Sequence, residues 1–181
     1  MSDKLLEARY FIEQMISNEA HHLPFKYSLS AFLSASRSVM QLLHTKGLSV
    51  QGFQAWYDQQ MQDPLLRFFR NTRDFSVHEG QLSLDAATQD GAMPEVRILK
   101  NVGGSYTMIA SLHLYESKEL NPIVLVPQTG NIEYRTNFCW AFSDYPEDID
   151  LKNEVLELCN DYLQRIETCA IEANKLFCVH L

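Results

Sequence analysis

Two arginines, an aspartate and a histidine lie within nine residues of one another in the first half of the chain. The segment 70–78 reads Arg-Asn-Thr-Arg-Asp-Phe-Ser-Val-His, and its charged and titratable members are Arg70, Arg73, Asp74 and His78. Arginine can hold a phosphate bidentately at any physiological pH, and histidine can move a proton near neutrality. The segment therefore predicts binding or cleavage of a phosphodiester.

Cleavage of RNA without a metal ion needs a base for the 2′-hydroxyl proton, an acid for the leaving oxygen and a cation for the charged phosphorane. We expect Arg73 and His78 to be catalytic, as the cation and the proton-transfer group. Asp74 lies about 40° from His78 around a helix, so we expect it to orient the imidazole and favour its charged form. The expected substrate-binding residues are Arg70, Asn71 and Arg37.

The spacing of Arg73 and His78 restricts how they can act together. Positions five residues apart diverge by about 140° on an ideal helix, so one straight helix cannot easily clamp a phosphate with both. Fraying of residues 76–80 would bring them closer, as would two copies of the chain that face each other across a symmetry axis. The alternative is a structural cluster, in which the helix dipole favours His78 and Arg70 or Arg73 pairs with Asp74.

Four further polar positions have structural interpretations. Arg37 and His44 are seven residues apart, hence on nearly one helix face beside an apolar stripe. The alternative to substrate binding by Arg37 is that it caps carbonyl groups or pairs with an acid. His21 and His22, next to Pro24, are expected to be solvated loop residues.

The length and charge of the chain predict one acidic domain with a local basic patch. A chain of 181 residues, 46% of them hydrophobic, can bury one full core, so we expect a single domain over 1–181. The net charge is −8, yet residues 1–80 carry eight basic and eight acidic side chains, which leaves the acidity in the second half. The balance excludes non-specific duplex binding, which rests on broad phosphate neutralisation.

Hydrophobic periodicity predicts a mainly helical α+β fold. An up-and-down helical bundle is expected to contain a four-stranded antiparallel sheet, inserted before the C-terminal helix. The helical part with the motif spans 1–80, the inserted sheet 81–147 and the C-terminal helix 148–181. Helices are expected over 3–20, 25–46 with Gly47 as a stop, 50–62, 64–80 with Asp63 as N-cap, and 146–177. Strands are expected over 95–100, 106–115, 122–127 and 131–142, the last with one aromatic, buried face.

No segment predicts a membrane span, a signal peptide, a metal site or a cofactor site. The four cysteines show no close C-x-x-C spacing, and three of them fall in one helical pattern, which favours small buried hydrophobes over ligands. We therefore expect a cytoplasmic protein that needs no metal and no cofactor.

The order of these segments resembles the HEPN superfamily. The resemblance is carried by Tyr27-Ser-Leu-Ser-Ala-Phe-Leu-Ser-Ala-Ser-Arg-Ser-Val39, then Asp63-Pro-Leu-Leu-Arg-Phe-Phe69, then Arg73-Asp-Phe-Ser-Val-His78. It implies a dimeric helical bundle and, in active members, a metal-independent endoribonuclease, often in toxin–antitoxin or defence systems. Arg73, Asp74 and His78 would match the motif arginine, polar residue and histidine.

The resemblance also implies the partners. We expect a homodimer that binds RNA or a nucleotide, with a cognate antitoxin or another protein as a further partner. The sheet over 82–142 departs from the compact family pattern. The second hypothesis is therefore a non-catalytic HEPN-like module that binds a nucleotide in the same cleft or a protein on the sheet.

Overall fold

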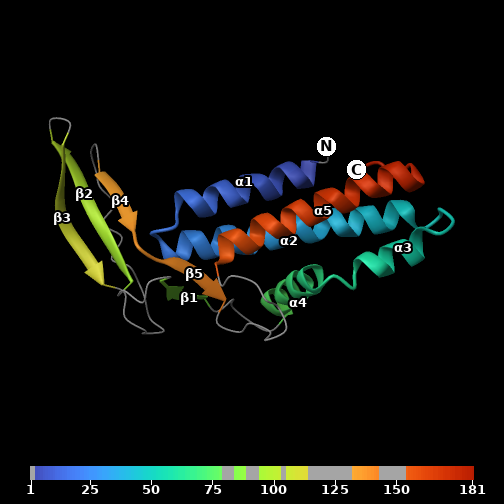
Figure 1. Ribbon diagram of the computed structural model, residues 1–181, viewed down its shortest axis with the longest axis horizontal. Coiled ribbons are helices and arrows are strands. Elements are labelled where there is room, and N and C mark those ends of the chain that lie inside the picture. The colour runs from blue at the N-terminus through green and yellow to red at the C-terminus, as the bar shows by residue number, and fades with distance from the viewer. Residues whose placement is uncertain (1–2, 79–83, 89–93, 103–104, 114–131, 143–153) are drawn as a thin grey trace.

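Helices make up most of the computed structural model, which describes residues 3–78, 84–88, 94–102, 105–113, 132–142 and 154–181. The helices are α1 (Asp3–Ser17), α2 (His22–Gly47), α3 (Phe53–Gln60), α4 (Pro64–His78) and α5 (Val155–Phe177). In Figure 1, α1, α2 and α5 lie lengthwise beside one another, and α3 and α4 run back along the bundle. The prediction of a mainly helical α+β fold is confirmed.

Several helix ends differ from the prediction. The helix α2 begins at His22, so Pro24 lies inside its first turn instead of preceding it. Proline is tolerated there because the first N–H groups of a helix have no intrahelical partner. The helices α1 and α3 are shorter than expected. The predicted ends at residues 80 and 146 lie outside the described residues.

Glycine ends α2, but for a different reason from the one expected. Leu48, which follows Gly47, keeps a right-handed conformation with φ −52°, so no left-handed cap forms. Gly47 itself is buried, and a Cβ atom at this position would overlap the ring of Phe53. Among the described glycines, Gly52 at the start of α3 has a left-handed φ of +82°. Gly47 is therefore needed for the close approach of α3 to the end of α2.

The strands form two sheets, so the prediction of one four-stranded sheet is wrong. They are β1 (Leu84–Ala87), β2 (Glu95–Val102), β3 (Ser105–His113), β4 (Ile132–Thr136) and β5 (Cys139–Phe142). Among the described residues, β1 pairs with β5 and β2 pairs with both β3 and β4, always antiparallel. The strand predicted over 122–127 lies outside the described residues.

Asn137 explains why the predicted strand 131–142 is divided. Its side-chain Oδ1 accepts a hydrogen bond from the backbone N of Glu95 at 2.7 Å, and its own N donates to the Glu95 O at 3.3 Å. These bonds end the β2–β4 ladder. The chain then continues as β5 in the other sheet, beside β1, a strand whose four residues Leu-Asp-Ala-Ala give little sequence signal.

The strand β5 carries the expected aromatic face into the helical core. Phe138, Trp140 and Phe142 are buried. The Trp140 Nε1 donates to the backbone O of Glu19 at 2.8 Å, and its ring lies 5.0 Å from the ring of His22. His22 is therefore packed against the sheet and is not the solvated loop residue expected. The three-stranded sheet extends from this end of the bundle, as Figure 1 shows.

We predict that Gly47→Ala destabilises the protein by about 1–3 kcal/mol, the usual range for overpacking a core. The added methyl group must displace the fully buried ring of Phe53. Urea unfolding followed by circular dichroism measures the change, with Ser49→Ala at an exposed position of the same connection as the control. A Gly47→Ala protein as stable as wild type would contradict the close contact.

Candidate functional site

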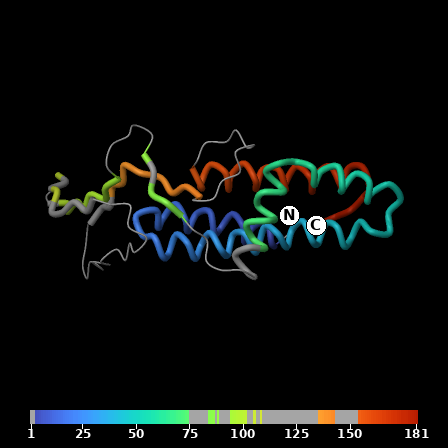
Figure 2. Tube along the Cα trace, turned by 90° about the horizontal axis from the view of Figure 1, so that it is seen from below, coloured from blue at the N-terminus to red at the C-terminus, as the bar shows by residue number. Residues whose placement is uncertain are grey.

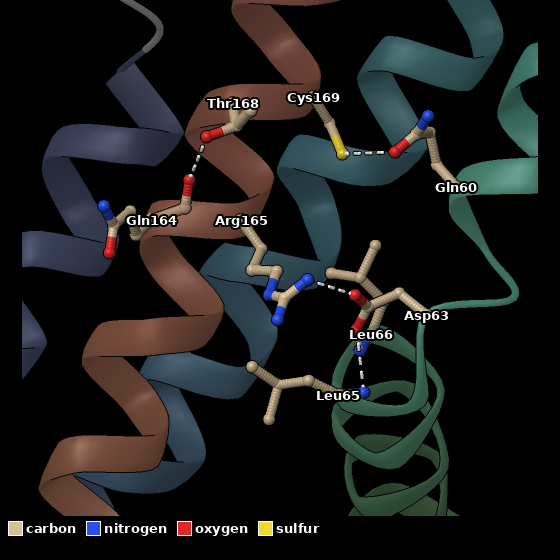
Figure 3. A network of polar contacts seen from close by, with 8 residues as sticks. All are labelled: Gln60, Asp63, Leu65, Leu66, Gln164, Arg165, Thr168 and Cys169. Atoms are coloured by element: carbon tan, nitrogen blue, oxygen red, sulfur yellow. Dashed lines mark hydrogen bonds and ion pairs between the residues drawn. The ribbon is translucent and has the colours of Figure 1, made fainter.

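The motif helix α4 is fixed at its first turn by Asp63. The Asp63 Oδ1 accepts hydrogen bonds from the backbone N of Leu65 at 2.8 Å and of Leu66 at 3.2 Å. The predicted N-cap is thus confirmed. The other carboxylate oxygen forms an ion pair with Arg165 of α5 (Figure 3). One turn farther along α5, the Cys169 Sγ lies 3.8 Å from the Gln60 Oε1. Two contacts therefore join the α3–α4 connection to α5.

Aromatic packing sets the rotation of α4 about its axis. The ring of Phe69 stacks on the ring of Tyr162 in α5, with centroids 4.3 Å apart and an interplanar angle of 4°. Phe32 of α2 meets both rings edge-on, at 6.3 and 6.2 Å. Neighbouring members of the buried face of α4 are Leu65, Leu66 and Phe68. This packing holds the polar residues that follow Phe69 on α4, Arg70 and Arg73 among them, at the border of the helical core.

Arg73 and Asp74 lie next to each other and form an ion pair. The Arg73 Nη1 is 3.2 Å from the Asp74 Oδ1, and the two side chains are 30% and 46% exposed. The alternative of a structural cluster, in which Arg70 or Arg73 pairs with Asp74, predicts this ion pair. Asn71 is exposed, and His78 is the last residue of α4. The side chain of His78 lies outside the described part of the chain, so its orientation by Asp74 stays a prediction.

Arg37 and Arg70 lie on two helices that pack against each other. Both arginines are half-buried, Arg37 on α2 and Arg70 on α4. Tyr57 on α3 is only 8% exposed, and its hydroxyl donates to the backbone O of Met40, one turn from Arg37, at 3.4 Å. Tyr57 thus joins α3 to α2 one turn from Arg37.

Burial raises the pKa values of two tyrosines in this part of the core. Burial raises the pKa of Tyr57, and the positive charges of Arg37 and Arg70 offset part of that increase. Burial raises the pKa of Tyr162 far above its usual range, again opposed by Arg37. Both phenols are therefore neutral at physiological pH and can donate a hydrogen bond. Sequence periodicity places these tyrosines in apolar stripes, which gives no sign that arginine charges influence their pKa values.

His44 and the cysteines have structural surroundings. The His44 Nε2 lies 3.1 Å from the Gln54 Oε1, and its ring packs 4.6 Å from that of Tyr57. Cys159 and Cys169 are buried, as expected, and burial raises the pKa of each thiol, to about 11 for Cys169. Cys178 is exposed, contrary to expectation, because the chain has left α5 in a left-handed conformation with φ 54°.

A groove of about 450 Å³ lies elsewhere, between α1 and α5. Its lining includes Glu13, Asp161 and Glu167, and Arg9 is already paired to Glu167 at 2.6 Å. This excess of acidic groups is unsuited to a phosphate. Within the described ranges, no group of three or more His, Cys, Asp or Glu side chains could hold a metal ion. Nor is any described helix long and apolar enough to cross a membrane.

Comparison with known proteins gives no relative. No family model, curated protein or solved structure matches the chain. Inference about function therefore rests on the motif helix and its surroundings.

Two substitutions at Asp63 distinguish the stabilisation by its N-cap from the stabilisation by its ion pair with Arg165. Asp63→Ala removes both, and we expect it to lower the free energy of unfolding by about 1–2 kcal/mol. Asp63→Asn keeps a capping oxygen. It should lower that free energy by less than about 1 kcal/mol, because the Arg165 side chain is 56% exposed to solvent.

Arg165→Gln is the matched control, since it breaks the same ion pair from the other side. Its stability in urea should equal that of Asp63→Asn. If Asp63→Asn lost as much stability as Asp63→Ala, the ion pair and not the cap would be what fixes α4.

Proposed function

We propose that the protein is a HEPN-like, metal-independent endoribonuclease that acts as a homodimer. One observation carries the proposal: α4 is helical as far as His78. Positions 73 and 78 of a continuous helix diverge by about 140°, so fraying does not bring them together. Two antiparallel copies of α4 can instead offer Arg73 of one chain and His78 of the other to one phosphate.

His78 and Arg73 fill two of the three roles in the cleavage step, those of the base and the cation. A histidine takes the 2′-hydroxyl proton, the 2′-oxygen attacks phosphorus, and the bond from phosphorus to the 5′-oxygen breaks. The 5′-oxygen leaves with a proton from an acid. Arg73 stabilises the additional negative charge on the phosphorane. The products are a 2′,3′-cyclic phosphate and a 5′-hydroxyl. Asn71 is exposed next to Arg70 and would contact the chain of the RNA.

A second candidate is a HEPN-like module that binds without cleaving. The ion pair between Arg73 and Asp74 favours it, because the guanidinium and the carboxylate engage each other. In this candidate, RNA or a nucleotide occupies the same cleft. A protein partner, such as a cognate antitoxin, would use the sheet that extends from the bundle.

We predict that the purified protein cleaves single-stranded RNA in EDTA and leaves 2′,3′-cyclic phosphate ends. His78→Ala should reduce the rate at least about 100-fold, because a proton-transfer group is lost. Arg73→Ala should have an effect of similar size, because the phosphorane loses its cation. Gel electrophoresis of end-labelled RNA measures the rate and identifies the ends.

The matched controls are His180→Ala and Arg67→Ala, two exposed residues outside the motif. Both should cleave as wild type does. Undiminished cleavage by His78→Ala would refute the assignment of the histidine. Tight RNA binding without any cleavage would favour the second candidate.

A further inference from the structure

The geometry points to a pH-sensitive joint between strand β5 and the helical bundle, in which protonation of His22 weakens the attachment of the strand. The joint consists of the side chains of His22, Phe25 and Trp140 and the backbone carbonyl of Glu19. It contains no residue of the motif helix α4. Its behaviour is therefore independent of the proposed cleavage of RNA.

Trp140 attaches β5 to the helices. Only 3% of this residue is exposed, and its Nε1 donates a hydrogen bond to the Glu19 O at 2.8 Å, in the connection between α1 and α2. Its ring lies 5.0 Å from that of His22 and 5.9 Å from that of Phe25, both in the first turn of α2. Figure 1 and Figure 2 show β5 beside this end of the bundle. These contacts therefore depend on the short segment 19–25 keeping its place.

His22 fits this position as a neutral ring. It is half-buried, and its Nδ1 atom is buried without a hydrogen-bond partner among the described residues. A neutral imidazole can carry its proton on Nε2 and leave a lone pair at Nδ1, whereas an imidazolium has an N–H group at both nitrogens. Protonation would therefore bury an N–H donor with no acceptor, which is unfavourable. The attraction of a cation to the indole face of Trp140 acts in the opposite direction, but the ring planes are inclined by 46°, so the imidazole does not lie flat on the indole.

Charges on α2 add to the cost of protonating His22. It is the first residue of α2, where the helix dipole disfavours a cation, and the preceding N-cap residue, His21, makes no side-chain hydrogen bond to this end of the helix. Lys26 lies one turn farther along the same helix. Burial lowers the pKa of His22, and the positive charge of Lys26 lowers it further. Within the described ranges, no carboxylate forms an ion pair with His22 that would offset these effects.

Titratable groups on the neighbouring elements do not produce the same response to acid. They are Glu19 of the α1–α2 connection, Glu154 at the N-cap of α5 and Cys139 of β5. Burial, and then the charge of Glu154, raise the pKa of Glu19. Burial, followed by the same charge, also raises the pKa of Cys139, so this thiol stays protonated in mild acid. A carboxyl whose pKa is raised in the folded state binds its proton more readily there, so mild acid would stabilise the joint at Glu19.

Acid should weaken the joint in a defined pH range. The pKa of His22 is lower in the closed joint than in water, where it is about 6.5. The closed joint therefore has its full stability above that value and loses stability as the pH falls below it, until the pH reaches the lowered pKa of the closed form. The ratio of open to closed joints rises by up to about tenfold for each unit that separates the two pKa values.

Hydrogen exchange of the Trp140 indole N–H, measured by NMR from about pH 7.5 to about pH 5.5, tests the proposal. The full chain would carry Trp56→Phe, which leaves Trp140 as its one tryptophan. The protection of this N–H should fall as the pH decreases below about 6.5, after correction for the effect of pH on the chemical rate of exchange. Backbone amides in the middle of α2 and α5 should keep their protection, because only the joint opens.

His22→Gln keeps a polar side chain that does not titrate, so the protection of the Trp140 indole should become independent of pH in this range. The matched controls are His21→Gln, at the adjacent position, and Glu19→Gln, which keeps the backbone acceptor. Both should retain the pH dependence. Lys26→Gln raises the pKa of His22, so the fall in protection should be smaller even if His22→Gln fails to fold.

Three results would overturn the proposal. The first is protection of the Trp140 indole that does not change with pH in the parent protein. The second is an unchanged fall in His22→Gln, or its disappearance in His21→Gln, since either would assign the response to another group. The third is an equal loss of protection at the amides of α2 and α5, which would indicate global unfolding. Absence of RNA cleavage would contradict the ribonuclease proposal alone and leave the joint standing.

Discussion

The stack of Phe69 on Tyr162 is the interaction on which the arrangement of the site depends. It joins α4 to α5 at 4.3 Å between ring centroids, and Phe32 closes the contact from α2. A ring pair buried in this way is stabilised by its apolar area and by its geometry. Because Phe69 is fixed, the direction in which Arg70 and Arg73 leave the helix is also fixed. The N-cap at Asp63 sets where that helix begins, and so sets the height of each residue along the bundle.

Charge is distributed so that an acidic protein can present a positive face. The net charge is −8, but acids near the motif have partners: Asp63 pairs with Arg165, and Asp74 with Arg73. Arg37 and Arg70 are half-buried and form no ion pair with a described residue. Neighbouring charges within a Debye length decide the local potential, whereas the net charge of the whole chain acts more weakly at that distance. The acidity of the chain as a whole therefore does not exclude a local positive patch on α4.

Features that depend on neighbouring residues could be predicted from the sequence, and features that depend on distant pairing could not. The cap at Asp63 and the buried stripe of α4 follow from local chemistry, and both are present. The division of one predicted strand at Asn137 depends on a bond to Glu95, 42 positions away, so no local pattern shows it. Arg37 was expected at the site from its type, but the packing of its helix α2 against α4 results from tertiary structure and not from local sequence. The requirement for glycine at position 47 likewise could not be predicted locally, because it depends on the ring of Phe53, which packs against Gly47.

Sharing of one active site by two chains is the central claim, and mixing two inactive variants tests it most directly. Arg73→Ala and His78→Ala would be combined, allowed to exchange subunits, and assayed for cleavage of RNA in EDTA. A dimer with one chain of each kind has one complete site, so the mixture should regain roughly a quarter of the wild-type rate while each variant alone stays inactive. A mixture as inactive as its components, beside an active wild type, would contradict the shared site.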